Sequence, residues 1–301
     1  MPKTKTKKGS AKRRVGILRG GTGEHYASSL KKGGDIILYI SENLSNKYKV
    51  VDILIDKDHI WHLGGLPISP SDLAHRVDIV WNTTHPSFSN ILDSLSIPNI
   101  GISSFFHILE NNKDTLRKHI KDLEISLPRQ VVSSKSARVV FEKFGSPWVV
   151  KSFSDGSNSL AVHLAHTFNE LVARIEDGLK QGKSILVEEF IVGKVASVHS
   201  VPYFRGQEFY VFPPINVFGQ LSFGEKEKLI SLAKGLHKHI GAKHYLKSNF
   251  VLNKRGKIYL LDLDSTPNLN SYSHFSQACE SVGAKTHHVV EHVLDSALGA
   301  I

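Results

Sequence analysis

The sequence predicts an α/β protein that begins with a parallel β-sheet. Short apolar runs at 15–18, 50–55 and 77–82 have the composition and length of buried strands. Helical stretches follow the first and third runs, at 24–43 and near 90–95, and strands that alternate with helices form parallel sheets. A chain of 301 residues with 41% hydrophobic side chains also has the size and composition to bury about two domain cores.

Positive charge is concentrated at the amino terminus. Residues 1–14 contain seven lysine and arginine side chains and no acidic one, whereas the whole chain has 38 basic and 28 acidic residues. The net charge of +10 is therefore largely a property of this basic tail. Such a tail favours contact with nucleic acid or another anionic surface, and the alternative is a solvated leader without a role.

Cysteine content and hydropathy exclude several classes of protein. Cys279 is the single cysteine, so neither an internal disulfide nor a four-cysteine zinc site can form within one chain. The basic tail lacks the apolar stretch of a secretory signal, and no run approaches the ~18 apolar residues of a membrane span. We therefore expect a soluble, cytoplasmic protein with no membrane insertion.

The remaining elements are predicted from strand patterns, capping motifs and a glycine stop. The middle of the chain predicts a helix at 113–123, strands at 127–132, 147–151 and 184–191, and a helix at 167–179. The last part predicts strands at 195–201, 207–212, 247–252 and 257–264, a helix at 225–240 that Gly241 ends, and a helix from Thr286.

The hairpin around 253–256 places polar side chains on one face. If its loop has an even number of residues, paired positions add up to 509 and Lys247 lies opposite Asp262. Since side chains alternate along a strand, one face carries Lys247, Asn249, Asp262 and Asp264. The other face then belongs to the core and carries Ser248, Phe250, Leu252, Tyr259, Leu261 and Leu263.

This polar face has the chemistry of a cation site. Aspartates two positions apart on one strand repel one another unless a cation lies near them. Carboxylate and amide oxygens suit Mg²⁺, which takes few protein carboxylates together with substrate phosphates. The alternative is an edge hairpin whose polar face is only solvated.

Two segments have the composition of phosphate-binding loops. Lys151 ends an apolar strand and precedes the Ser- and Gly-rich segment 152–159, whose backbone N–H groups would face phosphates. The alternative is that Lys151 and the segment after it form a surface hairpin without a ligand. The segment 20–23 lies between a strand and a helix, where anions are favoured. It lacks the third glycine of a dinucleotide site and the Gly-Lys-Ser/Thr of a P-loop, which excludes both of those motifs.

Taken in order, these segments resemble the D-alanine–D-alanine ligases of the ATP-grasp superfamily from Val15 to Leu294. The matching segments are Gly-Gly-x-x-Glu-His at 20–25, Asn-x-x-His at 82–85, Lys-Asp at 113–114, Val-Lys-Ser with Gly-Ser at 150–157, Val-Glu-Glu-Phe at 187–190 and Asp-x-Asp-Ser-x-Pro at 262–267. Their order and spacing carry the resemblance, which covers the body of the chain.

The resemblance implies a fold and a division into domains. A Rossmann-like parallel-sheet domain would come first, followed by the two subdomains of an ATP-grasp fold, which are α+β in character. The boundaries that we expect are a basic tail at 1–14, a first domain at 15–102, a small ATP-grasp subdomain at 103–189 and a carboxyl-terminal subdomain at 190–301. ATP would then lie between the second and third domains.

The resemblance also implies roles for individual residues, with ATP and Mg²⁺ as cofactors. The residues that would contact the nucleotide are Lys113, Lys151, Glu188, Phe190 and Ile191. Those that would hold Mg²⁺ are Asp262, Asp264 and Asn249. The residues that would serve the reaction are Ser157 and Lys247, the latter in place of an arginine that steadies the intermediate. The substrate-side positions are His85, Asn268 and Ser273.

The implied reaction joins a carboxylate to an amine through an acyl phosphate, as in peptidoglycan precursor synthesis. We expect a small amino-acid-like substrate and a homodimer, with nucleic-acid contact only through the basic tail. The family's long lid is missing, because the segment 213–215 runs almost directly into the helix predicted at 225–240, and Val195 replaces a ribose-binding glutamate. These departures favour one alternative, a nucleotide-binding protein with lost or altered ligase activity. A nucleic-acid-associated protein that acts through its tail is a further alternative.

Overall fold

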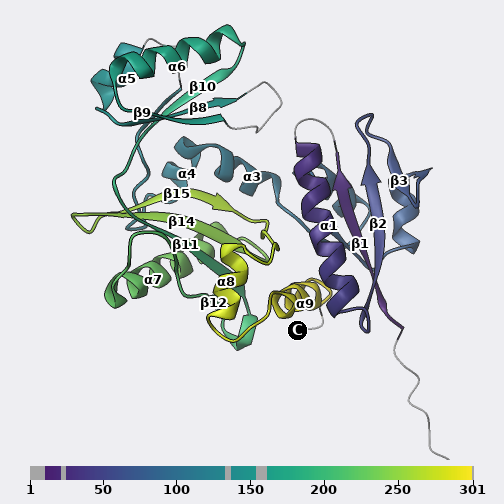
Figure 1. Ribbon diagram of the computed structural model, residues 1–301. Helices are drawn as coiled ribbons and strands as arrows, with labels where there is room; N and C mark the ends of the chain where they lie inside the picture. The colour runs from purple at the N-terminus through teal and green to yellow at the C-terminus, as the bar shows by residue number, and fades with distance from the viewer. Residues whose placement is uncertain (1–10, 22–24, 133–136, 154–160, 300–301) are drawn as a thin grey trace, which may run out of the picture.

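The computed structural model describes residues 11–21, 25–132, 137–153 and 161–299 (Figure 1). Within these ranges the strands form three sheets. One contains the amino-terminal strands, a small second one lies at the top of Figure 1, and the third lies below the second. Ser157 falls outside the described residues, as does most of the loop predicted at 152–159.

The first sheet has the strand order β4-β3-β2-β1-β5-β6. Its parallel strands are β1 (Arg13–Gly20), β2 (Tyr48–Ile55), β5 (Ile79–Asn82) and β6 (Asn99–Ile100). The helices on its two faces are α1 (His25–Asn43) with α9 (Thr286–Ala297) on one, and α2 (Pro86–Ser94) on the other. A hydrophobic core lies on each face of this sheet. Successive residues of β1 point to opposite faces, so Ile17 packs with α1 and Leu18 packs with α2. The predicted parallel sheet is confirmed.

The second sheet is antiparallel and has the order β7-β10-β8-β9. Its strands are β7 (Gln130–Val132), β8 (Trp148–Phe153), β9 (Ala161–Ala165) and β10 (Ser184–Glu189). Helices α5 (Ala137–Lys143) and α6 (Phe168–Lys180) pack on the sheet around the buried Trp148. The Thr167 hydroxyl accepts the Glu170 backbone N–H at the start of α6, as the capping motif predicts.

The third sheet has the order β12-β11-β14-β15, with β13 paired to β11. Its strands are β11 (Gly193–Pro202), β12 (Phe209–Val211), β13 (Ile215–Phe218), β14 (Leu246–Asn253) and β15 (Ile258–Asp264). Helix α7 (Phe223–Ile240) packs on this sheet between a Ser222–Glu225 capping box and Gly241, whose φ of 71° ends the helix. Only residues 219–222 join β13 to α7, so the connection is as short as the sequence predicts.

The β14–β15 hairpin departs from the predicted register near its turn. Its loop consists of residues 254–256, because the Asn253 N–H donates to the Lys257 carbonyl at 3.0 Å. This odd loop reverses which β15 residues face the core. Ile258 and Leu260 are buried there, so the core positions predicted for Tyr259 and Leu261 are wrong.

A β-bulge restores the predicted polar face farther along the hairpin. The bulge lies between Asn249 and Phe250 and shifts the pairing by one more position. Lys247 therefore lies opposite Asp264, and Asn249 lies opposite Asp262. The predicted pairs are displaced by two residues, and a displacement by two returns side chains to the same face.

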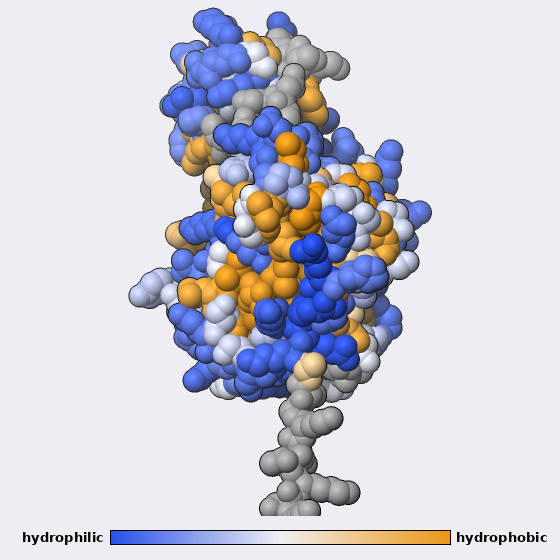
Figure 2. All heavy atoms as spheres, turned by 90° about the vertical axis from the view of Figure 1, so that its right-hand side faces the viewer, coloured by the Kyte–Doolittle hydropathy of each residue, from blue (hydrophilic) through white to orange (hydrophobic). Residues whose placement is uncertain are grey.

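Elements with few residues escape the sequence analysis. The missed strands and helices include β3 (Trp61–Leu63), β4 (Leu66–Ile68), the 3-10 helix Pro70–His75, α3 (Ser104–Asn111), β9, α5 and β13. Figure 2 shows the side of the molecule that carries β3, where hydrophobic side chains gather among polar ones. In the part of the chain that the structure describes, no helix is long and apolar enough to cross a bilayer.

Candidate active site

The bulged half of the β14–β15 hairpin forms a polar floor, by which we mean Lys247, Asn249, Asp262 and Asp264. The register places the four side chains on one face of the two strands. The Asn249 amide nitrogen Nδ2 donates to Asp262 Oδ1 at 2.7 Å. Asp264 Oδ1 accepts the Thr266 N–H at 2.9 Å and so fixes the start of the next loop. The structure thus brings together the three residues predicted to hold Mg²⁺.

The negative charges of Asp262 and Asp264, the two carboxylates of the polar floor, repel one another. Burial among surrounding protein atoms is the main cause that raises the pKa of Asp262, and the charge of Asp264 adds to it. Lys247 and Asn249 oppose the rise without cancelling it. Asp262 is nevertheless exposed to solvent. Many protein atoms lie around its carboxyl group, but they do not separate it from water. A cation beside the polar floor would relieve the repulsion.

A second cluster, the Lys–Glu–Lys triad, consists of Lys113, Glu188 and Lys151. Lys113 Nζ lies 2.7 Å from Glu188 Oε1, and Lys151 Nζ lies 2.7 Å from Glu188 Oε2. The carboxylate is on β10, Lys151 is on the adjacent β8, and Lys113 begins α4 (Lys113–His119). Only 6% of the Glu188 side chain is exposed, so the ion pairs are well shielded from solvent. Three residues predicted to contact a nucleotide therefore meet at one carboxylate.

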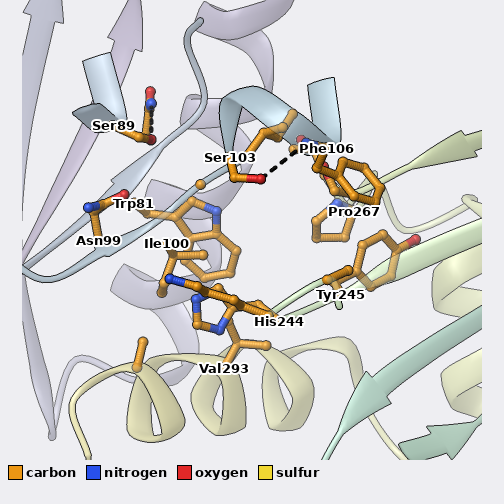
Figure 3. A pocket seen from close by; sticks show the side chains of 18 of the residues that line it. Trp81, Ser89, Asn99, Ile100, Ser103, Phe106, His244, Tyr245, Pro267 and Val293 are labelled. Carbon is orange, nitrogen blue, oxygen red and sulfur yellow. Dashed lines mark hydrogen bonds between the residues drawn. The ribbon is translucent and has the colours of Figure 1, made fainter. Parts of the chain in front are cut away.

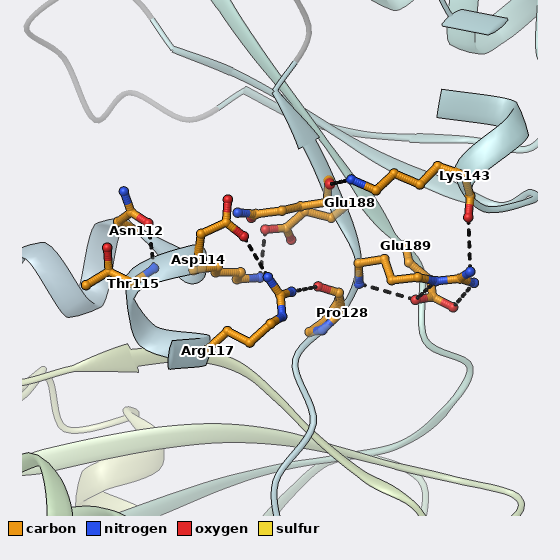
Figure 4. Close-up of polar contacts among 11 residues, drawn as sticks. Asn112, Asp114, Thr115, Arg117, Pro128, Lys143, Glu188 and Glu189 are labelled. Carbon is orange, nitrogen blue, oxygen red and sulfur yellow. Dashed lines mark hydrogen bonds and ion pairs between the residues drawn. The ribbon is translucent and has the colours of Figure 1, made fainter. Parts of the chain in front are cut away.

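Local structure explains how the triad is oriented. The Asn112 side chain accepts the Thr115 N–H at 2.9 Å and caps α4, which fixes Lys113 in its first turn. Neighbouring residues of β10 point to opposite sides, and Figure 4 shows Glu188 facing the side of α4 while Glu189 points away from it. Glu189 binds Arg129 through both carboxylate oxygens.

Charge coupling connects the triad to the polar floor. Burial lowers the pKa of Lys113, and the neighbouring Lys151 adds to the effect against the attraction of Glu188. Burial alone would raise the pKa of Glu188, but the two lysines hold it below its ordinary value. Lys113 and Asp262 also attract one another strongly enough to affect the pKa of each. The two clusters are therefore parts of one charged site.

The segment after β10 connects the second sheet to the third. Phe190, predicted beside the adenine, is partly exposed, and its N–H donates to the Pro147 carbonyl at 3.3 Å. Ile191 follows it and precedes β11. Because the Phe190 N–H already has a partner, a nucleotide base would have to use other backbone groups of this segment.

The residues predicted on the substrate side lie at helix starts and in a loop. His85 Nδ1 accepts the Ser87 N–H at the start of α2, and the Ser273 hydroxyl accepts the Ser276 N–H at the start of α8 (His274–Glu280). Asn268 is exposed in the loop that follows the polar floor. Their roles toward a substrate stay predictions, and Ser157 lies outside the described residues.

Sequence analysis missed Glu110, a carboxylate on α3 beside this site. Glu110 Oε1 accepts the Ser265 N–H at 2.7 Å, directly after Asp264. Burial raises the pKa of Glu110 to about 8, and the charge of Asp264 adds to the effect. The sequence offers no signal for this contact, because 155 positions separate its partners and α3 itself was not predicted.

A buried histidine also lies beside the polar floor, on the neighbouring strand β11. His199 on β11 pairs with Lys247 on β14, and its Nδ1 lies 2.7 Å from the Tyr245 hydroxyl. Burial lowers the pKa of His199 to about 3, with a smaller contribution from Lys247, so the ring is neutral at pH 7. The period-two pattern of β11 could have indicated that His199 and Ser197 share the face of the polar floor.

The donor set of the polar floor fits Mg²⁺. Among the described residues, no group of three or more His, Cys, Asp or Glu side chains converges as a metal cluster. Asp262, Asp264 and Asn249 instead offer two carboxylates and an amide, and Mg²⁺ is usually held by one or two carboxylates, waters and substrate phosphates. Burial and the charge of Asp264 raise the pKa of Asp262 although Lys247 opposes the rise, so a bound cation would stabilise the charged carboxylate.

Comparison with known proteins finds similarity to ligases over nearly the full length of the chain. No model of a known protein family matches it. It is 24% identical to the D-alanine–D-alanine ligase of Geobacter sulfurreducens over 94% of each chain. The D-alanyl-alanine synthetase A structure from Vibrio cholerae superposes with a TM-score of 0.79 at 19% identity, covering 96% of this chain and 99% of the other.

A further structure extends this likeness to a nucleotide complex. The D-alanine–D-alanine ligase of Bacillus anthracis complexed with ATP superposes with a TM-score of 0.73 at 17% identity, covering 96% of this chain and 98% of the other. The likeness covers nearly the full length in each case, which agrees with the order of motifs in the sequence. The chain therefore has the fold of these ligase structures, and its sequence is similar to D-alanine–D-alanine ligases over nearly its full length.

Proposed function

We propose that the protein is an ATP- and Mg²⁺-dependent carboxylate–amine ligase that works through an acyl-phosphate intermediate. One observation carries the proposal: Lys113 and Lys151 converge on Glu188, and Lys113 is coupled to Asp262 of the polar floor. This arrangement supports a site where nucleotide phosphates meet lysines on one side and cation-binding carboxylates on the other. The full-length similarity to D-alanine–D-alanine ligases supports the reaction class.

Nucleotide binding in this proposal exchanges the partners of the lysines. Phosphate oxygens take the place of Glu188 at Lys113 and Lys151, because their greater negative charge attracts both ammonium groups more strongly. The released carboxylate of Glu188 can then accept a hydrogen bond from the amino group of the base. Phosphoryl transfer depends mainly on positioning and charge neutralisation, and two fixed lysines provide both.

The polar floor would position the transferred group. Asp262, Asp264 and Asn249 would hold Mg²⁺, which neutralises phosphate charge when it is bound. Lys247 shares their face and lies opposite Asp264, so its ammonium group can steady negative charge on the intermediate. An ammonium group acts as a point charge, whereas the arginine of the family offers a bidentate fork.

The chemistry takes two steps. A carboxylate oxygen of the first substrate attacks the γ-phosphorus of ATP, the bond from that phosphorus to the bridging oxygen breaks, and ADP leaves. The amine of the second substrate then attacks the acyl carbon and loses its proton, while phosphate leaves with the electron pair of the carbon–oxygen bond. We propose small amino acids as substrates, with D-alanine as the first candidate, and the cytoplasm as the place where ATP is supplied.

Product analysis tests this function. The full chain is incubated with ATP, Mg²⁺ and D-alanine, and then with a panel of other small D- and L-amino acids, while ADP and dipeptide are measured by mass spectrometry. We expect ADP and dipeptide in equal amounts, and a loss of at least about 100-fold in Lys151→Ala, since a group that stabilises transferred charge is removed. Lys180→Ala on α6, where the side chain is 78% exposed, is the matched control and should keep full activity.

Two outcomes would count against ligation. ADP formed without any new amide bond would mean that the acyl phosphate is hydrolysed or never made. Binding of nucleotide without turnover across the panel would favour the nucleotide-binding alternative.

A further inference from the structure

A cavity of about 440 Å³ lies between the first sheet, the loop after α7, the loop after β15 and helix α9 (Figure 3). Among the described residues that line it, none is predicted to bind ATP, Mg²⁺ or substrate. Ser265, Thr266 and Pro267 form one wall, directly after Asp264 of the polar floor. The cavity is therefore a neighbour of the candidate active site and is built from other residues.

Aromatic and aliphatic side chains line the cavity together with polar ones. Trp81 comes from β5, Phe106 from α3, Phe275 from α8, and Val293 from α9. Figure 3 shows Trp81, Phe106 and Tyr245 arranged around an open centre, with Val293 on the side of α9. Protein interiors are close-packed, and ligand sites typically have volumes of about 300–1,000 Å³, so this cavity has the size of a site for a small molecule.

One polar atom of the lining has no partner. In the described part of the chain, His244 Nδ1 is buried and neither accepts nor donates a hydrogen bond. Buried polar groups are nearly always paired, because an unpaired group loses its hydrogen bonds to water without replacing them. The backbone N–H and the hydroxyl of Ser265 both bond the Glu110 carboxyl, so the ring nitrogen of His244 is the group left for a ligand.

The interior is uncharged. Burial lowers the pKa of His244 to about 4, and Lys243 contributes, so its ring is neutral at pH 7. The charged residues of the lining, Asp93 and Lys243, are both exposed to solvent and so lie toward the opening. A neutral ring nitrogen selects an uncharged ligand with a hydrogen-bond donor, and the aromatic walls select a flat ring.

We propose that this cavity, which we call the Trp81 cavity, binds a small uncharged aromatic molecule that carries a hydroxyl group. The aromatic ring of the ligand packs against the cavity walls at Trp81 and Phe106. The ligand hydroxyl donates to His244 Nδ1, which satisfies this buried atom. The site is separate from the one proposed for ATP, so the proposal does not depend on ligase activity.

The test uses 1-naphthol as the probe and the full chain. Calorimetric titration should give saturable binding with one probe molecule per chain, and saturating Mg²⁺ with a non-hydrolysable ATP analogue should not displace it. His244→Phe keeps a ring of similar shape and removes the nitrogen, so we expect affinity at least about tenfold weaker. His166→Phe, at an exposed position before α6, is the control and should bind as the unchanged chain does.

The melting temperature of each variant shows whether it folds. Because His244→Phe removes an unpaired buried polar atom, the ligand-free variant should melt at the same temperature as the unchanged chain or higher. Val293→Phe fills the cavity from α9 and should abolish binding by obstruction. The proposal is overturned if the folded chain does not bind the probe, if His244→Phe binds it equally well, or if the nucleotide analogue displaces it.

Discussion

Lys113 Nζ lies 2.7 Å from Glu188 Oε1 and joins the start of α4 to the second sheet. The other oxygen of the same carboxylate holds Lys151 at 2.7 Å. The Lys–Glu–Lys triad thus keeps two cations close together through one shielded anion. The arrangement has consequences for stability and for nucleotide binding.

Removal of the central charge should destabilise the protein. Glu188→Gln leaves Lys113 and Lys151 close together without a counterion, and breaking a buried ion pair in this way typically costs about 3 kcal/mol. We expect the free energy of unfolding in urea to fall by that amount. Glu189→Gln is the control, since its Arg129 partner is 55% exposed and such pairs contribute at most about 1 kcal/mol. Equal effects of the two substitutions would contradict this account of the triad.

Acid should destabilise the protein through buried histidines. Burial lowers the pKa of His199 to about 3 and those of His237 and His244 to about 4. Between these values and their ordinary pKa of 6.5, the unfolded chain binds more protons than the folded one, so stability falls as pH falls.

The expected loss is on the order of 3 kcal/mol for each of these histidines between about pH 6.5 and pH 4, because each unit of pKa difference corresponds to about 1.4 kcal/mol per group. Unfolding in urea at several pH values measures it. His237→Gln should give a smaller slope with pH, because it removes one buried group that the unfolded chain protonates. A slope identical to that of the unchanged chain would show that His237 makes no such contribution. His166→Gln, at an exposed position, is the control.

The polar floor predicts a response to Mg²⁺. In Asn249→Asp the amide that donates to Asp262 Oδ1 becomes a third carboxylate, so like charges repel when no cation is present. We expect a lower melting temperature without Mg²⁺ and a larger rise than in the unchanged chain when Mg²⁺ is added. Asn169→Asp on the exposed side of α6 should respond as the unchanged chain does. A variant that Mg²⁺ stabilises no more than the unchanged chain would argue against a cation at Asp262.

Much of the fold could be predicted because its longer elements carry strong local signals. The apolar runs that became β1 and β2 and the capping box at Ser222 each specify an element from neighbouring residues alone. Elements of two or three residues, such as β4 and β6, have too few positions to show a period. Pro98–Gly101 was nevertheless visible as a short apolar segment between turn residues.

The candidate site was predicted in part, for a different reason. Alternation on the hairpin gave the face shared by Lys247 and Asp262 but not its register, because a bulge is fixed by packing across strands and leaves no local mark. The meeting of Lys113 with Glu188 required the resemblance to a family, since 75 positions separate them in the sequence. Glu110 was missed because its role depends on a contact between α3 and a distant loop.

Nucleotide binding is the most direct measurement of the central claim. Mg²⁺ with a non-hydrolysable ATP analogue is titrated calorimetrically into the unchanged chain, Lys151→Ala and the control Lys180→Ala. Each charge-assisted contact contributes about 1.5–3 kcal/mol, so the account predicts binding that Lys151→Ala weakens by at least about tenfold and Lys180→Ala leaves unchanged. No binding by the folded chain, or equal affinity in Lys151→Ala, would contradict the assignment of the triad as the nucleotide site.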